Sequence, residues 1–122
     1  MEHTQLAKDI AAILYDRKAQ DILVLNVSSI TVLCDMMVIA SGRSAQQVKT
    51  LSDEVEARLA GQTAPPRHIE GYHEGRWIVM DYHSVIVHLF HQEERAFYHL
   101  ERLWADGSNR VPMPFDEETD NA

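Results

Sequence analysis

Two short apolar segments separated by only a few residues constrain the fold of this chain more than any other feature. Residues 76–82 and 85–90 are rich in β-branched and aromatic side chains, which predicts the two strands of a β-hairpin. A loop of two or four residues would fix three pairs across it: Asp81 with Ile86, Val79 with His88, and Trp77 with Phe90. A loop of odd length would break this register.

The two faces of the predicted hairpin differ, because paired residues lie on the same face of a sheet. One face has a pattern typical of a core: Ile78, Met80, Tyr82, Val85, Val87 and Leu89. The other face carries Trp77, Val79, Asp81, Ile86, His88 and Phe90. Two interpretations of this second face stay open. Helices cover it and leave Asp81 and His88 near the margin, or it is an exposed patch in which a Trp beside a carboxylate forms a binding hot spot.

Three amphipathic helices are predicted from apolar residues that recur at helical spacing. The first spans residues 5–18 with Thr4 as its N-cap, and the second spans residues 45–60 with Ser44 as its N-cap. The second helix is expected to bury a stripe made of Val48, Leu51, Val55 and Leu59. The third spans residues 92–105, and its expected buried stripe consists of Phe97, Leu100, Leu103 and Trp104.

Further strands are predicted at residues 22–27, 36–40 and 68–72. The resulting order, α-β-β-α-β-β-β-α, predicts an α/β fold with a mixed sheet of about five strands packed by helices. A chain of 122 residues suits one domain, which we assign to residues 1–106. Residues 107–122 are polar, acidic and without periodicity, so we expect a mostly disordered tail there.

The charge and cysteine content narrow the possible partners and compartment. The formal net charge of -8 opposes binding to a phosphate backbone, so a ribonucleoprotein partner would be contacted through a basic protein rather than through bare RNA. The single cysteine, Cys34, fits a reducing compartment. The sequence contains neither an apolar run long enough for a membrane span nor a recognisable leader, so we expect a cytoplasmic protein.

Motifs for catalysis or metal binding are weak in this sequence. The gaps between His83, His88 and His91 match no familiar zinc spacing. Residues 41–44, Ser-Gly-Arg-Ser, favour a capped turn before a helix over an anion site. The sequence lacks paired strand carboxylates of the kind that hold Mg²⁺ for phosphoryl transfer. We therefore expect a protein that is not an enzyme and that has no metal and no cofactor.

Several blocks, in order along the chain, resemble the Iojap-related family of ribosomal silencing factors. They are SSIT and CDMMVIASGRS within residues 28–44, QVKTLSDEV at 47–55, IEG at 69–71, WIVMDY with VIVH within 77–88, and RAFYHLERLW at 95–104. The resemblance extends over roughly residues 4–105. Because the blocks occur together and in order, it is far more specific than any single motif.

The resemblance implies a fold related to nucleotidyltransferases but without their catalytic motif, in agreement with the missing carboxylate pair. It implies binding to large-subunit ribosomal protein fourteen on the intersubunit face of the large ribosomal subunit. A factor bound there would block joining with the small subunit and repress translation under nutrient limitation or in stationary phase. The resemblance also implies a homodimer when the protein is free.

Carried over by position, the resemblance places the partner-binding residues at Trp77, Asp81, Tyr82, Val85 and His88, with Glu70 and Tyr98 as further candidates. Trp77 would supply buried apolar area, and Asp81 would accept hydrogen bonds from Arg or Lys of a basic protein. Two other classes of function stay open. One is a nucleotidyltransferase-like enzyme that binds nucleotide and Mg²⁺, and the other is a generic dimeric adaptor.

Overall fold

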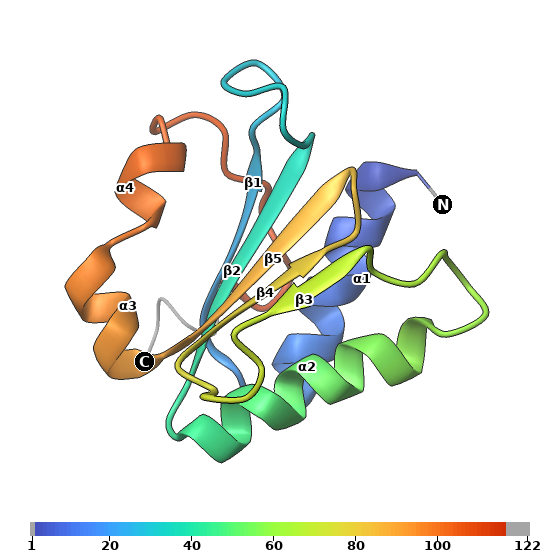
Figure 1. The fold of residues 1–122 in the computed structure, drawn as a ribbon. Coiled ribbons are helices and arrows are strands. Elements are labelled where there is room, and N and C mark those ends of the chain that lie inside the picture. The colour runs from blue at the N-terminus through green and yellow to red at the C-terminus, as the bar shows by residue number, and fades with distance from the viewer. Residues whose placement is uncertain (1, 117–122) are drawn as a thin grey trace.

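The computed structural model describes residues 2–116, which form four helices and five strands (Figure 1). The helices are α1 (His3–Asp16), α2 (Ala45–Leu59), α3 (Gln92–Tyr98) and α4 (Glu101–Trp104). The strands are β1 (Gln20–Asn26), β2 (Met36–Gly42), β3 (His68–Glu70), β4 (Trp77–Asp81) and β5 (Val85–His91). The predicted α/β class and five-stranded sheet are confirmed.

The five strands form one mixed sheet in the order β1-β2-β5-β4-β3. Strands β2 and β5 run parallel, and every other neighbouring pair is antiparallel. His83 and Ser84 form the loop from β4 to β5, and the Tyr82 N–H donates to the Val85 carbonyl at 2.9 Å. This even loop produces the three predicted pairs between β4 and β5, so the predicted register of the hairpin is confirmed.

Helices cover the two faces of the sheet unequally. Helices α1 and α2 pack against one face, while the shorter α3 and α4 lie on the other (Figure 1). The α1–α2 side holds the larger core, which contains all six residues of the predicted core face of the hairpin and the predicted stripe of α2. The α3–α4 side holds a smaller cluster around Met37, Ile39, Phe90 and Leu100. Strand β2 lies between the two cores and is buried along its whole length.

The N-cap of α2 was predicted correctly from the sequence, and that of α1 was not. The Ser44 hydroxyl accepts a hydrogen bond from the Gln47 N–H at 3.0 Å, as predicted. The prediction of Thr4 as the N-cap of α1 is wrong. The N-cap is Glu2, whose carboxylate accepts from the N–H groups of Thr4 and Gln5 at 3.0 and 3.1 Å. A longer acidic side chain thus occupies the capping position.

The last predicted helix is two helices, because His99 adopts a left-handed conformation with φ of +50° and ends α3. The break changes the direction in which later side chains point, so the expected buried stripe is wrong in part. Leu100 is buried, but Phe97 and Leu103 are 76% and 72% exposed. Arg95 holds the bend together, since its guanidinium donates to Ser41 Oγ at 2.9 Å and to Glu101 Oε1 at 3.4 Å.

The first part of the predicted tail is ordered against β1, so the expectation of disorder is wrong for residues 107–116. The Val111 N–H donates to the Val24 carbonyl at 2.8 Å, and the Asn26 N–H donates to the Asn109 carbonyl at 2.9 Å. Phe115 is buried and stacks on Tyr15 with ring centroids 4.5 Å apart. The segment satisfies backbone groups that an edge strand otherwise exposes. Residues 117–122 lie outside the described part.

Candidate protein-binding surface

Five aromatic side chains gather where β4, β5 and α3 meet, and we call this group the aromatic patch: Trp77, His88, Phe90, Phe97 and Tyr98. The Trp77 ring lies 4.8 Å from Phe90, 5.2 Å from Tyr98 and 5.9 Å from His88, measured between ring centroids. Phe97 meets Tyr98 edge to face at 5.0 Å. Phe90 is fully buried beneath the others. Such packed rings attract one another by about 0.5–1.5 kcal/mol per pair beyond their burial.

Helices cover one part of the second hairpin face and leave the other part partly exposed. Leu100 and Trp104, from the α3–α4 side, pack in the cluster that contains Phe90 and thereby cover the part of the face next to β1 and β2. The remaining residues of the face are half-buried: Trp77, Val79, Asp81, Ile86 and His88. This part includes one edge of the aromatic patch and is accessible to a partner.

His88 holds the Trp77 ring in place through a hydrogen bond. The Trp77 Nε1–H donates to His88 Nδ1 across 3.0 Å, which requires the imidazole to be neutral. Burial lowers the pKa of His88 to about 4, so the imidazole remains neutral near pH 7. The indole ring has a single hydrogen-bond donor, Nε1–H. This bond therefore fixes which edge of the ring faces outward. His88 is therefore a positioning residue for Trp77.

Asp81 closes the hairpin turn and forms an ion pair on the same face. Its Oδ1 accepts from the His83 N–H at 2.7 Å, and its Oδ2 accepts from the Arg67 guanidinium at 3.1 Å. His83 lies in the turn with a φ of +76°. Burial acts to raise the pKa of Asp81, but these two interactions outweigh it and hold the pKa below its usual value. The carboxylate thus stays charged and keeps lone pairs for a further donor.

The other predicted partner-binding residues fall on two sides of the sheet. Glu70 pairs with Val79 and is exposed on the face of Asp81, and Tyr98 contacts Trp77 from α3. Tyr82 and Val85 belong to the larger core on the opposite face, as the hairpin pattern predicts, so they do not share the surface of Trp77. Neighbouring residues along a strand point to opposite faces, and this alternation separates them.

Two residues of this surface were missed from the sequence. Arg67 was not identified, because its ion pair with Asp81 depends on the antiparallel register of β3 and β4. Phe97 was assigned to the core, whereas the structure exposes it beside Tyr98. An Arg directly before a predicted strand is too common a feature to have signalled the first. Phe97 is exposed because the helix breaks at His99, and no glycine at that position indicates a break in the sequence.

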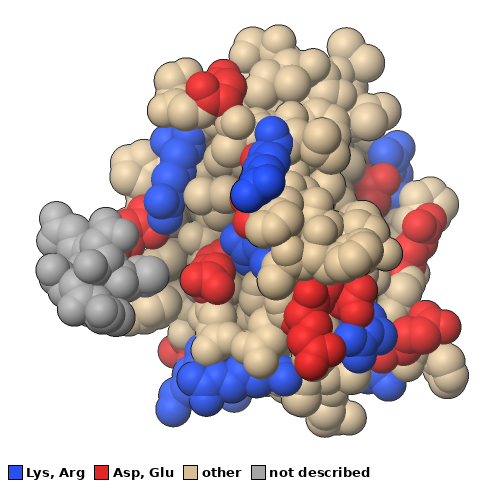
Figure 2. Space-filling view, turned by 90° about the vertical axis from the view of Figure 1, so that its left-hand side faces the viewer, with Lys and Arg blue, Asp and Glu red and all other residues tan. Residues whose placement is uncertain are grey.

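Charged side chains are scattered over this side of the molecule without covering it. Figure 2 faces the α3–α4 side and shows a surface that is mostly neither acidic nor basic, with acidic side chains gathered toward its lower right. Arg76 is paired with Glu93 and Glu94 at the start of α3, at 3.2 and 2.6 Å. The surface therefore combines charged groups with exposed aromatic rings, and Trp and Tyr are enriched in protein-binding hot spots.

Other candidate sites carry less chemistry. Residues 2–116 hold no group of three or more His, Cys, Asp or Glu side chains placed to bind a metal ion. Ser44 is engaged as a helix cap, in line with the capped turn that was favoured for residues 41–44. Within the same range, no helix is long and apolar enough to cross a membrane. The fold and the aromatic patch thus define a small α/β protein whose most developed surface feature is suited to binding another protein.

Comparison with known proteins places the chain in a family. Residues 1–122 match the family model described as "Ribosomal silencing factor during starvation". A ribosomal silencing factor from Bacillus subtilis is 35% identical over 106 residues, which cover 87% of this chain and 90% of the relative. The corresponding protein of Halalkalibacterium halodurans is 37% identical over 91 residues, covering 75% and 78%. This chain belongs to the ribosomal silencing factor family.

Solved structures agree with this assignment. A crystal structure of a protein from Chromobacterium violaceum superposes with a TM-score of 0.82 at 32% identity, covering 93% of this chain and 92% of that one. A crystal structure of a protein from Bacillus halodurans gives a TM-score of 0.73 at 34% identity, covering 90% and 96%. The mixed α/β architecture is therefore shared with solved proteins of similar sequence.

Proposed function

We propose that this protein binds the large ribosomal subunit through large-subunit ribosomal protein fourteen. Bound there, it blocks joining with the small subunit and represses cytoplasmic translation under nutrient limitation or in stationary phase. The family supports a ribosomal role. The observation that carries the choice of surface is the exposed edge of the aromatic patch, which lies on the same sheet face as Asp81.

The aromatic patch provides the apolar part of the proposed contact. Trp77 is half-buried and held by His88, and Tyr98 and Phe97 extend the patch outward with exposed fractions of 50% and 76%. A ring fixed before binding loses little conformational entropy in the complex. Trp and Tyr are also the residues that most often contribute large binding energies at protein interfaces.

The acidic residues provide the electrostatic part of the contact. Asp81 and Glu70 lie on the same face of the sheet, and the net charge of the whole chain is -8. A basic ribosomal protein would be attracted at long range, which raises the association rate. At the interface, an Arg or Lys of that protein would bind Asp81 beside Arg67 or in its place.

Sedimentation of ribosomal subunits on a gradient tests the proposal directly. The Trp77→Ala variant should weaken binding to the large subunit by about 2 kcal/mol or more, roughly a thirtyfold loss, because it removes the centre of the contact. Tyr72→Ala is the matched control, since Tyr72 is also an exposed aromatic residue but hydrogen-bonds Asp53 of α2, on the other side of the sheet.

Three outcomes of this experiment are informative. The proposal expects co-sedimentation of the wild type and of Tyr72→Ala with large subunits, and its loss for Trp77→Ala. Equal binding by all three proteins would show that the aromatic patch is not the contact surface. Failure of the wild type to bind large subunits, or to slow subunit joining, would contradict the function itself.

The proposal includes the absence of catalysis, and calorimetry separates it from a nucleotidyltransferase-like activity. Titration with nucleoside triphosphates and Mg²⁺ should release no binding heat from this protein. The proposal also includes a homodimer in the free protein. Light scattering during gel filtration should give twice the chain mass of 13.9 kDa, and a monomer across all concentrations would contradict this part.

A further inference from the structure

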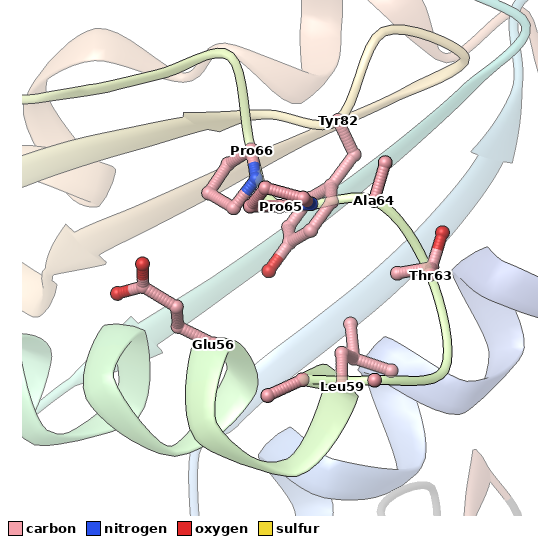
Figure 3. Close-up of a pocket in the computed structure, with 9 residues that line it drawn as sticks. Glu56, Leu59, Thr63, Ala64, Pro65, Pro66 and Tyr82 are labelled. Atoms are coloured by element: carbon pink, nitrogen blue, oxygen red, sulfur yellow. The ribbon is translucent and has the colours of Figure 1, made fainter.

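A pocket lies on the opposite side of the molecule from the aromatic patch. It occupies about 280 Å³ between the end of α2, the connector to β3 and the hairpin residue Tyr82. Figure 3 shows Leu59 below and Pro65, Pro66 and the Tyr82 ring above, with the Tyr82 hydroxyl directed downward. Most of the lining is apolar, so the pocket favours an apolar ligand.

The wall formed by the connector is rigid, so the pocket exists before any ligand binds. Pro65 and Pro66 have fixed φ angles. The N–H groups of Gln62 and Thr63 both donate to the Leu59 carbonyl, at 3.0 and 3.3 Å, and close the turn that follows α2. A preformed wall avoids the cost of ordering a loop during binding.

The Tyr82 hydroxyl is an unused hydrogen-bond donor in this pocket. Tyr82 is 8% exposed, and its hydroxyl has no hydrogen-bond partner in the described part of the chain. In Figure 3 the hydroxyl points toward the space between Glu56 and Leu59. Burial, with the charge of Glu56 as a smaller cause, raises the pKa of Tyr82 to about 12, so the proton stays on the oxygen at neutral pH.

The prolines cannot provide this donor, since neither has an N–H group. A buried donor without a partner is unfavourable, and an acceptor brought by a ligand would remove that penalty. Glu56 lies at the rim and would repel an anion. The pocket thus favours a ligand that is largely apolar, uncharged and able to accept one hydrogen bond.

We propose that the pocket binds a small neutral ring compound with a carbonyl or ether oxygen, whose ring packs on Leu59 and Pro65 and whose oxygen accepts from Tyr82. An apolar cavity of about 150 Å³ holds benzene. The volume of this pocket therefore has room for a ring with a short substituent. The site does not depend on the proposed ribosomal contact.

Acetophenone, a phenyl ring with one carbonyl, is the probe for this proposal, and toluene is its control without an acceptor. Titration of the full chain followed by ¹H–¹⁵N spectra should shift the signals of residues 59–64 and Tyr82 with a Kd on the order of 1 mM. Tyr82→Phe should bind acetophenone roughly fivefold more weakly. The same variant should bind toluene as tightly as the wild type does.

A second variant shows whether a loss of binding comes from the pocket itself rather than from altered folding of Tyr82→Phe. Ala64→Trp places a large ring at an exposed position of the lining and should abolish binding of both probes while leaving the spectrum otherwise unchanged. The proposal is overturned if about 20 mM acetophenone, well above the expected Kd, shifts no signal of residues 59–64. It is also overturned if Tyr82→Phe binds acetophenone as the wild type does. Ala64→Trp should still co-sediment with large subunits.

Discussion

Replacing His88 by glutamine changes how the stability of the protein depends on pH. In the wild type, burial lowers the pKa of His88 to about 4, whereas a histidine in the unfolded chain titrates near its ordinary value of about 6.5. As the pH falls below 6.5, the unfolded chain therefore takes up a proton before the folded protein does. This uptake favours unfolding, so stability falls between about pH 6.5 and pH 4.

The size of this effect follows from the two pKa values. At pH 5 the penalty is about 2 kcal/mol relative to pH 7.5, and it approaches about 3 kcal/mol below pH 4. His88→Gln removes the titrating group but keeps a side chain whose oxygen can accept from the Trp77 Nε1–H. Between pH 7.5 and pH 5, the variant should therefore lose about 2 kcal/mol less stability than the wild type.

Urea unfolding followed by tryptophan fluorescence at a series of pH values measures this difference. His73→Gln, at an exposed position in the loop between β3 and β4, is the matched control for the loss of a histidine. The opposite result is that the wild type and His88→Gln lose the same unfolding free energy between pH 7.5 and pH 5, within about 0.5 kcal/mol. That result would refute the assignment of His88 as a buried neutral acceptor. Acid should also release the Trp77 ring, since a protonated Nδ1 cannot accept a hydrogen bond.

Two further substitutions test the backbone and the C-terminal segment. Gly71 and Gly61 both have positive φ angles, but a Cβ on Gly71 would lie 2.1 Å from the Trp77 carbonyl oxygen, whereas a Cβ on Gly61 meets nothing within 4 Å. Gly61→Ala should cost about 1 kcal/mol, and Gly71→Ala at least about 2 kcal/mol more, by urea unfolding. Phe115→Ala should lower stability by about 2–3 kcal/mol, because it removes a buried ring stacked on Tyr15. An unchanged unfolding midpoint for Phe115→Ala would show that the segment contributes nothing to stability.

The parts of the fold that were predictable depend on regularities within one or two elements. The alternation along β4 and β5 fixed which residues face the larger core, because side chains in a strand alternate between faces. Ser44 was identifiable as a cap, because its hydroxyl bonds an N–H group three residues later. The order of the C-terminal segment was harder to predict from the sequence, because residues 109–111 form hydrogen bonds with β1, which lies far away in the sequence.

The surface proposed for binding shows the same division. From the sequence by itself, Trp77, Asp81 and His88 could be placed on one face of a hairpin, because register follows from alternation and an even loop. The tertiary structure decided that His88 accepts from Trp77, that Arg67 pairs with Asp81, and that Tyr98 completes the cluster. These contacts depend on distances between elements, and on a helix break at His99 that no local pattern announces.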